Sequence, residues 1–479
     1  MLIFKNGMRK QDINSYFPLF IYIFCFIISL TVLWQGRIYG LFPTPSPGMD
    51  QLNFLNHADN MLKGVLPDSS YKLSFSYTVF LAFLSFISGG EIVIMRILQI
   101  ALCSLIPVLI FKLCRLLRCS FISSQAAALL YCFYGTIIFV SIGFLRAGPL
   151  ALCFIGFVYL LVKGFYSKKY YHYLLAGLLA GITVLGRENF IPVVLSPFIM
   201  LVFSSVRKHV KYQKAAIYLA GIFILITPMI IYNYIRFDAP ELIPGNFVHI
   251  FKFYHGETNI ETSEKLTSSI LERVPSQVKM FASSYEVPNS FSFYAHREII
   301  SLLEVLLVPF NLILAMAILA LFLDFKRLRS LFIGGMATGY FLTIIYFSMF
   351  YRFRIVDTPL LLVLCGLSIH LLIQAKFRKL IYVFSAVFVS VFFLLTYTHP
   401  DKLRTSSERR SVISTLIICK DYYKAEVLID KLIEDKVFLN NIEKYLVKSL
   451  YKEGYKEDAR RLFAKYKKEY RNQKILIKS

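Results

Sequence analysis

The first long apolar stretch, Phe17-Pro-Leu-Phe-Ile-Tyr-Ile-Phe-Cys-Phe-Ile-Ile-Ser-Leu-Thr-Val-Leu-Trp34, decides the fold class. Its length suits a bilayer, whose hydrocarbon core takes about 17–25 residues of helix to cross. Comparable stretches recur as far as Tyr397. Because backbone groups in hydrocarbon must bond to one another, each stretch is expected to be a helix. The sequence therefore predicts an all-α, polytopic membrane bundle. Its first span is retained, since no small-residue cleavage site follows it.

Composition and charge agree with this class. The 479 residues are 57% hydrophobic, whereas soluble domains are about 45–50% apolar. The net charge of +24 would suggest nucleic acid in a soluble protein, but the basic residues lie in short clusters between apolar stretches. Such clusters mark cytoplasmic loops. We therefore expect a plasma (inner) membrane protein without a nucleic-acid partner. Lys5, Arg9 and Lys10 place its N-terminus in the cytoplasm.

The basic clusters also predict the order of the spans. About eleven spans alternate correctly between the two sides of the membrane. After the first span, the fourth is expected to end near Lys163 and the ninth to end before Tyr351. The other eight spans are expected, in chain order, at about 92–111, 121–140, 173–185, 190–206, 215–234, 299–325, 355–374 and 380–397. The short aromatic segment 72–88 is expected to lie at the membrane interface instead.

This topology predicts two domains. Residues 1–397 form the transmembrane domain, with outer loops at about 35–91 and 235–298. Residues 398–479 form a soluble helical tail outside the membrane. The spacing of Tyr455, Ala459 and Phe463 is similar to a tetratricopeptide helix pair, and a small helical cap is the alternative.

The first outer loop contains the leading candidate for chemistry, Asp50. The segment Gly48-Met-Asp-Gln-Leu-Asn-Phe-Leu-Asn-His-Ala-Asp-Asn-Met-Leu-Lys-Gly64 has a helical pattern after Asp50. His57 then lies near the face of Asp50, whereas Asp59 points the opposite way. Asp50 is therefore interpreted either as a helix N-cap or as a catalytic carboxylate with His57 as its companion.

Arginines at the same outer side are the candidates for anion binding. Arg352 and Arg354 follow the ninth span, and Arg187 follows the fifth. The planar guanidinium suits phosphate, and snorkelling to headgroups is the alternative. A spacing of two residues places Arg352 and Arg354 on one side only if the segment is extended.

Several motifs are absent from the sequence. There is no Walker loop, no GxGxxG, no CxxC among the eight cysteines and no Asp-x-Asp pair. The sequence therefore predicts no metal ligands, although a divalent metal remains open. Phosphate-binding arginines without a nucleotide motif favour a donor that is already in the membrane.

At these motifs the chain resembles the GT-C glycosyltransferases, in the branch of the protein mannosyltransferases and the lipid A aminoarabinose transferase. The resemblance covers residues 1–397. It rests first on the spacing of Asp50, Phe54, Ala58 and Gly64 in the first outer loop. It also rests on three segments: Gly177-Leu-Leu-Ala-Gly-Ile-Thr-Val-Leu-Gly-Arg187, Tyr351-Arg-Phe-Arg-Ile-Val-Asp-Thr-Pro359 and Phe253-Tyr-His-Gly-Glu-Thr-Asn259. The second outer loop of the family often has a carboxylate, whereas this chain has Arg146 and no acid there.

The resemblance implies a glycosyltransferase that moves a hexosyl or pentosyl group from a polyprenyl-phosphate-linked donor, with inversion. Asp50 would be the base, and Arg352 and Arg354, with Arg187, would bind the donor phosphate while His57 orients Asp50. The acceptor would be a protein, lipid or glycan hydroxyl on the outer face. A flippase or transporter of lipid-linked sugars and a surface-polysaccharide polymerase or ligase are the alternatives.

Overall fold

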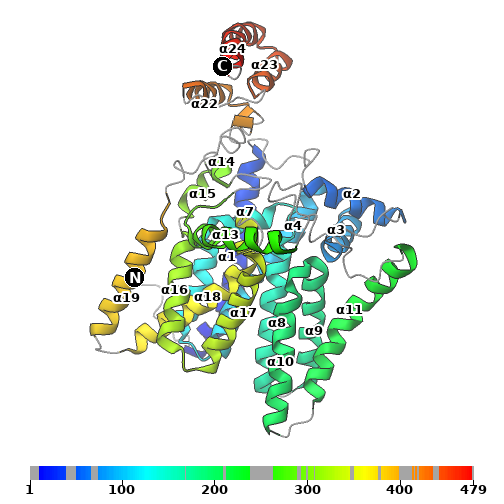
Figure 1. Ribbon diagram of the computed structural model, residues 1–479, viewed down its shortest axis with the longest axis vertical. Helices are drawn as coiled ribbons and strands as arrows, with labels where there is room; N and C mark the ends of the chain where they lie inside the picture. The colour runs from blue at the N-terminus through cyan, green and yellow to red at the C-terminus, as the bar shows by residue number, and fades with distance from the viewer. Residues whose placement is uncertain are drawn as a thin grey trace. The chain divides into compact units, whose positions relative to one another are not determined.

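The computed structural model describes residues 10–38, 50–65, 74–167, 169–208, 212–237, 263–287, 293–297, 300–306, 308–345, 350–375, 379–398, 413–414, 416–417, 420–434 and 442–476. Among these residues there are helices and turns but no strand (Figure 1). The all-α fold class is therefore confirmed.

In chain order the elements are α1 (Lys10–Ile38), α2 (Asp50–Leu62), α3 (Phe75–Ser88), α4 (Ile92–Cys103), α5 (Ile106–Leu116), α6 (Phe121–Phe133), α7 (Gly135–Ile142), α8 (Ala147–Ser167), α9 (Tyr170–Gly186), the 3-10 helix η1 (Glu188–Phe190), α10 (Ile191–Lys208), α11 (Gln213–Phe237), α13 (Ser263–Ala282), α14 (Phe293–Arg297), α15 (Ser301–Val305), α16 (Phe310–Asp324), α17 (Leu328–Ile344), α18 (Tyr351–Gln374), α19 (Lys379–Thr396), α22 (Tyr422–Glu434), α23 (Ile442–Lys452) and α24 (Lys456–Leu476).

The apolar helices make this a multi-pass membrane protein. Among the described residues, five helical segments are long and apolar enough to cross a bilayer, namely Tyr16–Ile38, Ile92–Leu116, Ala147–Ser167, Gln213–Arg236 and Tyr351–Gln374. Seven shorter apolar helices accompany them. The expected interface segment is one of these, α3, and the count of about eleven spans stays a prediction.

Two expected spans are interrupted, and a third contains a short turn. The segment 121–140 breaks at Tyr134, whose backbone is extended between α6 and α7. The segment 92–111 is part of a longer stretch in which α5 begins anew beside Pro107. The segment 299–325 breaks before Pro309, and α16 begins at the next residue. Proline accounts for the last of these breaks, because Pro309 has no backbone donor and stands as the N-cap of α16.

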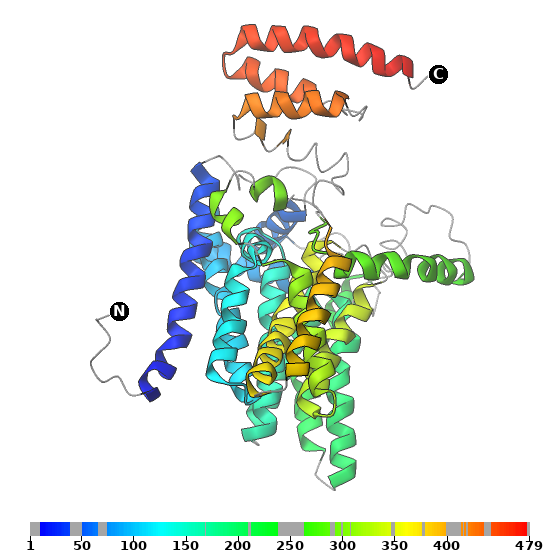
Figure 2. The same cartoon turned by 90° about the vertical axis from the view of Figure 1, so that its left-hand side faces the viewer.

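Contacts divide the chain into two compact units, of which unit 1 comprises Met1–Leu30, Pro45–Ser284 and Leu306–Tyr397. Helix α18 is the centre of unit 1: it packs against α5, α6, α8, α16 and α17, and it is buried along nearly its whole length (Figure 1). Helix α13 runs across the long helices rather than along them (Figures 1 and 2).

Glycines bring α9 and α11 into close contact. A Cβ added at Gly177 would lie 2.1 Å from Tyr218 O, and one at Gly221 would lie 2.5 Å from Leu174 O. Small residues allow helix backbones to approach in this way in membranes. The glycine-rich motif thus has a packing role, and α9 delivers Arg187 at its C-terminal end.

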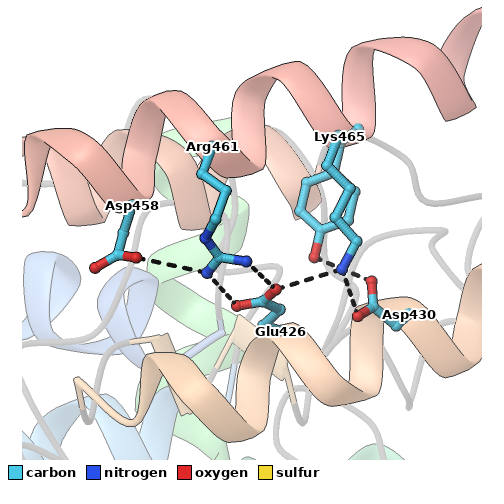
Figure 3. Close-up of polar contacts among 6 residues, drawn as sticks. Glu426, Asp430, Asp458, Arg461 and Lys465 are labelled. Carbon is cyan, nitrogen blue, oxygen red and sulfur yellow. Dashed lines mark hydrogen bonds and ion pairs between the residues drawn. The ribbon is translucent and has the colours of Figure 1, made fainter.

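Unit 2 comprises Thr31–Thr44, Tyr285–Val305 and Thr398–Ser479. Its helices α22, α23 and α24 lie side by side (Figure 2) around a core that includes Ile429 and Leu446. Ion pairs join α22 to α24: Glu426 accepts two hydrogen bonds of 3.0 Å from Arg461, and Asp430 accepts one of 2.6 Å from Lys465 (Figure 3).

Tyr455, Ala459 and Phe463, whose spacing is similar to a tetratricopeptide helix pair, differ in burial. Only Ala459 is buried, and Tyr455 and Phe463 are each more than half exposed. The buried face of α24 is formed by Ala459, Leu462 and Tyr466. The tetratricopeptide-like pair and the small helical cap both stay predictions for this segment.

Candidate active site

Helix α2 begins at Asp50, and the carboxylate of Asp50 lies beside the buried face of the helix, because residues four apart share a face. Phe54 and Ala58 are buried, and the Phe54 ring meets Tyr77 of α3 edge to face at 5.1 Å. Gly64 adopts a φ of +70°, which ends the helix in a conformation that glycine takes without strain. The spacing of Asp50, Phe54, Ala58 and Gly64 is therefore that of a packed helix with one acidic end.

Asp50 is bonded to Arg352. The Arg352 Nη1 atom donates a hydrogen bond of 2.5 Å to Asp50 Oδ2, and the two groups form an ion pair. The Asp50 side chain is 37% exposed, whereas that of Arg352 is 10% exposed. The first outer loop and the start of α18 thus meet at a carboxylate that solvent can reach.

Arg352 and Arg354 do not share one side of the chain. Helix α18 begins at Tyr351, so the segment is helical and residues two apart point in widely different directions. Arg354 is 1% exposed and donates from Nη1 to Ser283 O (2.7 Å) and Phe281 O (3.1 Å). These are carbonyls at the C-terminal end of α13, where cationic side chains are favourable.

Arg187 lies close to Arg352. It donates a hydrogen bond of 2.9 Å from Nη1 to the hydroxyl of Tyr340, and its guanidinium lies 4.0 Å from the ring centroid of Phe353. The Arg352 guanidinium lies 5.5 Å from the same ring. Burial lowers the pKa of Arg187, and the positive charge of Arg352 lowers it further.

Arg146 completes the cluster and was given no role from the sequence. It lies between α7 and α8 and donates a hydrogen bond of 3.1 Å from Nη1 to Gly186 O, beside Arg187. Burial, and then the neighbouring charges of Arg187 and Arg352, lower the pKa of Arg146 to about 10. The signal in the sequence was an arginine in an outer loop in which the family often has an acid.

Two glutamines fix the loop that carries Arg146. Gln99 of α4 donates to Ser141 O (2.9 Å) and Gly143 O (2.7 Å) and accepts a hydrogen bond of 3.0 Å from the Tyr77 hydroxyl. Gln51 accepts a hydrogen bond of 3.3 Å from Phe144 N. Since both amides act on the backbone, the loop shape is set by groups outside it.

The other predicted residues lie apart from this cluster. His57 is half-buried on α2, and within the described residues it makes no hydrogen bond to Asp50. Asp59 is exposed and pairs with Lys63 at 2.6 Å, so the two aspartates are separated as helical geometry predicted. The motif at 253–259 lies outside the described residues.

The described residues of this cluster do not fit a divalent cation. In the part of the chain that the structure describes, no group of three or more His, Cys, Asp or Glu side chains is placed to hold a metal ion. Among the described residues, the acids near the cluster include Asp50, which is bonded to Arg352, Glu188 and the buried Asp357. Three nearby guanidinium groups repel a cation.

Residues 74–232 match the family model described as dolichyl-phosphate-mannose-protein mannosyltransferase. This match confirms the resemblance to the GT-C superfamily that the motifs predicted. The matched range includes Arg146 and Arg187, whereas Asp50 and Arg352 lie outside it.

Two solved structures from Archaeoglobus fulgidus are similar to the chain. The oligosaccharyltransferase tethered with an acceptor peptide containing the NVT sequon has a TM-score of 0.41 at 11% identity, covering 87% of this chain and 59% of that chain. The oligosaccharyltransferase AglB in complex with an inhibitory peptide and a dolichol-phosphate has a TM-score of 0.42 at 11% identity, covering 86% of this chain and 59% of that chain. The chain therefore spans less than two thirds of their length. A comparison with curated proteins finds no match.

Proposed function

We propose that this protein is a membrane glycosyltransferase that moves a sugar from a polyprenyl-phosphate-linked donor to an acceptor hydroxyl on the outer face of the membrane. The observation that carries the proposal is the reachable carboxylate of Asp50 bonded to Arg352, whose guanidinium shares the ring of Phe353 with that of Arg187. The match to a family of sugar transferases over residues 74–232 supports the same activity.

Asp50 is the proposed general base. Its carboxylate removes the proton of the acceptor hydroxyl as the acceptor oxygen forms a bond to the anomeric carbon. The bond between that carbon and the donor phosphate oxygen breaks, and polyprenyl phosphate leaves with the electron pair. A single displacement of this kind inverts the anomeric configuration, and the proton then passes from Asp50 to solvent.

Arg352 and Arg187 are the proposed ligands of the donor phosphate. The phosphate gains negative charge as the sugar leaves, and preorganised guanidinium groups stabilise that charge more in the transition state than in the ground state. Phe353 holds both groups in place, since each lies against its ring. Arg354 acts differently in this proposal: it positions α13, and so the second outer loop.

The proposal also assigns sides and partners. The N-terminus lies in the cytoplasm, and the C-terminal tail lies outside the membrane with the site. His57 lines the approach to Asp50 along α2. The acceptor is a protein, lipid or glycan hydroxyl, framed by α3 and the second outer loop.

The test is transfer by the purified full-length protein. Defined polyprenyl-phosphate sugars are supplied with candidate acceptors, and the products are analysed by mass spectrometry. We expect transfer by the unaltered protein and at least about a hundredfold less by Asp50→Asn, because proton removal by a base contributes about that factor. Full activity of a folded Asp50→Asn variant would contradict the assignment of Asp50 as the base. Movement of intact donor across a vesicle membrane without transfer would indicate the flippase instead.

A further inference from the structure

The third arginine of the cluster, Arg146, has no part in the function proposed so far. Within the described residues it donates one hydrogen bond, from Nη1 to the carbonyl oxygen of Gly186. A guanidinium carries five N–H donors, so most of the capacity of Arg146 is left for another partner. The residue is only partly buried, which leaves it reachable.

The positive charges around Arg146 favour the binding of an anion. Arg146, Arg187 and Arg352 act on one another, and the carboxylates that act on them include Asp50 and Glu188. Three guanidinium groups therefore lie close enough to act on one another. Like charges held together in partly buried surroundings are unfavourable unless a further negative charge offsets them. Groups held in such unfavourable surroundings cluster at functional sites.

The backbone around Arg146 is held in place by side chains from two other helices. Gln99 is fully buried, and its side chain makes three hydrogen bonds, two of them to carbonyls of the 141–143 segment. Gln51, the neighbour of Asp50 in α2, bonds to Phe144 N. The base candidate and the loop that carries Arg146 are thus joined through two consecutive residues of α2.

We propose that Arg146 is a third ligand of the donor phosphate, and that guanidinium groups alone supply the positive charge that a divalent cation would otherwise bring. This inference rests on the proposed function. The negative charge of the phosphate grows by one as its bond to the sugar breaks, and a third guanidinium group beside it would stabilise that added charge. Arginine binds phosphate through paired N–H groups without the acidic ligands that a metal ion needs.

The test is binding of a short-chain polyprenyl phosphate to the detergent-solubilised full chain, in EDTA and in Mg²⁺. We expect binding that EDTA does not weaken. Arg146→Gln should bind about tenfold or more weakly, the effect of losing a hydrogen bond to a charged group, and Arg146→Lys should be intermediate. The control is Arg327→Gln, because Arg327 pairs with Asp324 and lies at the other end of α17 from Tyr340.

The outcomes separate the inference from the function. Wild-type affinity in Arg146→Gln, or loss of wild-type binding in EDTA, overturns the inference. If Arg146→Gln does not fold, the affinity of Arg146→Lys and the comparison of binding in EDTA and Mg²⁺ still test the inference. Transfer that survives in Arg146→Gln with unchanged affinity leaves the function standing and removes the inference. Binding by the unaltered protein without transfer of any sugar removes the function and leaves the arginine site.

Discussion

The carboxylate of Asp50 and the guanidinium of Arg352 are hydrogen-bonded at 2.5 Å although 302 residues separate them in the chain. One begins α2 and the other stands in the first turn of α18. The contact joins the proposed base to a proposed phosphate ligand. A donor phosphate that binds Arg352 would therefore compete with Asp50 for the same N–H groups, and the base would be released for the acceptor as the donor arrives.

Tyr340→Phe should weaken donor binding without disturbing the fold. The Tyr340 hydroxyl accepts a hydrogen bond from Arg187, while its ring packs against Phe190 at 4.8 Å. Phenylalanine keeps the ring and removes the acceptor, so Arg187 loses its orientation. We expect about fivefold weaker binding of polyprenyl phosphate, the effect of about 1 kcal/mol.

The control for Tyr340→Phe is Tyr218→Phe. Tyr218 is also fully buried, and its hydroxyl donates to Val194 O at 2.8 Å. This variant should lose similar thermal stability with no change in affinity. If the wild-type protein, Tyr340→Phe and Tyr218→Phe bind polyprenyl phosphate with equal affinity, Tyr340 has only a structural role.

Arg354→Gln should loosen the C-terminal end of α13. Arg354 donates to the carbonyls of Phe281 and Ser283, and its guanidinium lies 4.4 Å from the ring centroid of Phe310. Without these contacts the last turn of α13 opens more often, and its amides should exchange with solvent about tenfold faster. Hydrogen exchange with mass spectrometry measures this directly.

Arg115→Gln is the matched control for Arg354→Gln, because Arg115 binds a different turn through Cys119 O at 2.5 Å. It should leave the exchange of α13 unchanged. Unchanged exchange of α13 in Arg354→Gln, together with lost phosphate binding, would instead support the phosphate role that the sequence pattern predicted for Arg354.

Gly177→Ala should lower the melting temperature of the detergent-solubilised protein by several degrees. Its Cβ would lie 2.1 Å from Tyr218 O and 3.0 Å from the Cα of Gly221, so the backbones of α9 and α11 would have to separate. Gly335→Ala is the control, since nothing lies within 4 Å of a Cβ there. In a helix that change is neutral or stabilising by about 0.5–1 kcal/mol. Equal melting of the two variants would contradict the close packing.

Glu443→Gln should stabilise the C-terminal helices at pH 7 but not near pH 4. Glu443 is 3% exposed, and both its carboxylate oxygens are buried without a hydrogen-bond partner among the described residues. Burial raises the pKa of Glu443 above its ordinary value of 4.5. The folded state thus holds the proton more tightly than the unfolded state, so its stability falls as the pH rises from about 4.5 through the folded pKa.

The amide removes that penalty, so exchange of the α23 amides, corrected for intrinsic rates, should slow at pH 7 and change little near pH 4. Glu434→Gln serves as the control because Glu434 is exposed at the end of α22. A stabilisation of equal size at both pH values would argue against a buried titrating carboxyl.

Much of the architecture follows from local pattern. Apolar length predicted helices α8, α11 and α18, and the pattern after Asp50 predicted helix α2, because these signals depend on neighbours within a few turns. The separation of Asp50 from Asp59 followed from helical geometry alone.

The arginine site depended on contacts that no local pattern contains. Whether the segment at Arg352 is extended or helical decides where Arg354 points, and the helix begins at Tyr351 within the packed centre of unit 1. The place of Arg146 depends on amides from α2 and α4 that are distant in sequence. Such positions follow from tertiary packing, which spacing within one segment does not specify.

The amide of Gln99 has a consequence for how this site could diverge. Its contacts, like that of Gln51, are made to main-chain atoms of the loop, so the path of the loop does not depend on which side chain occupies position 146. An acid, an amide or a cation could be exchanged there by a single codon change or a few, while the scaffold stays the same. Relatives with the same two glutamines would then be expected to differ in their ion requirement rather than in their fold.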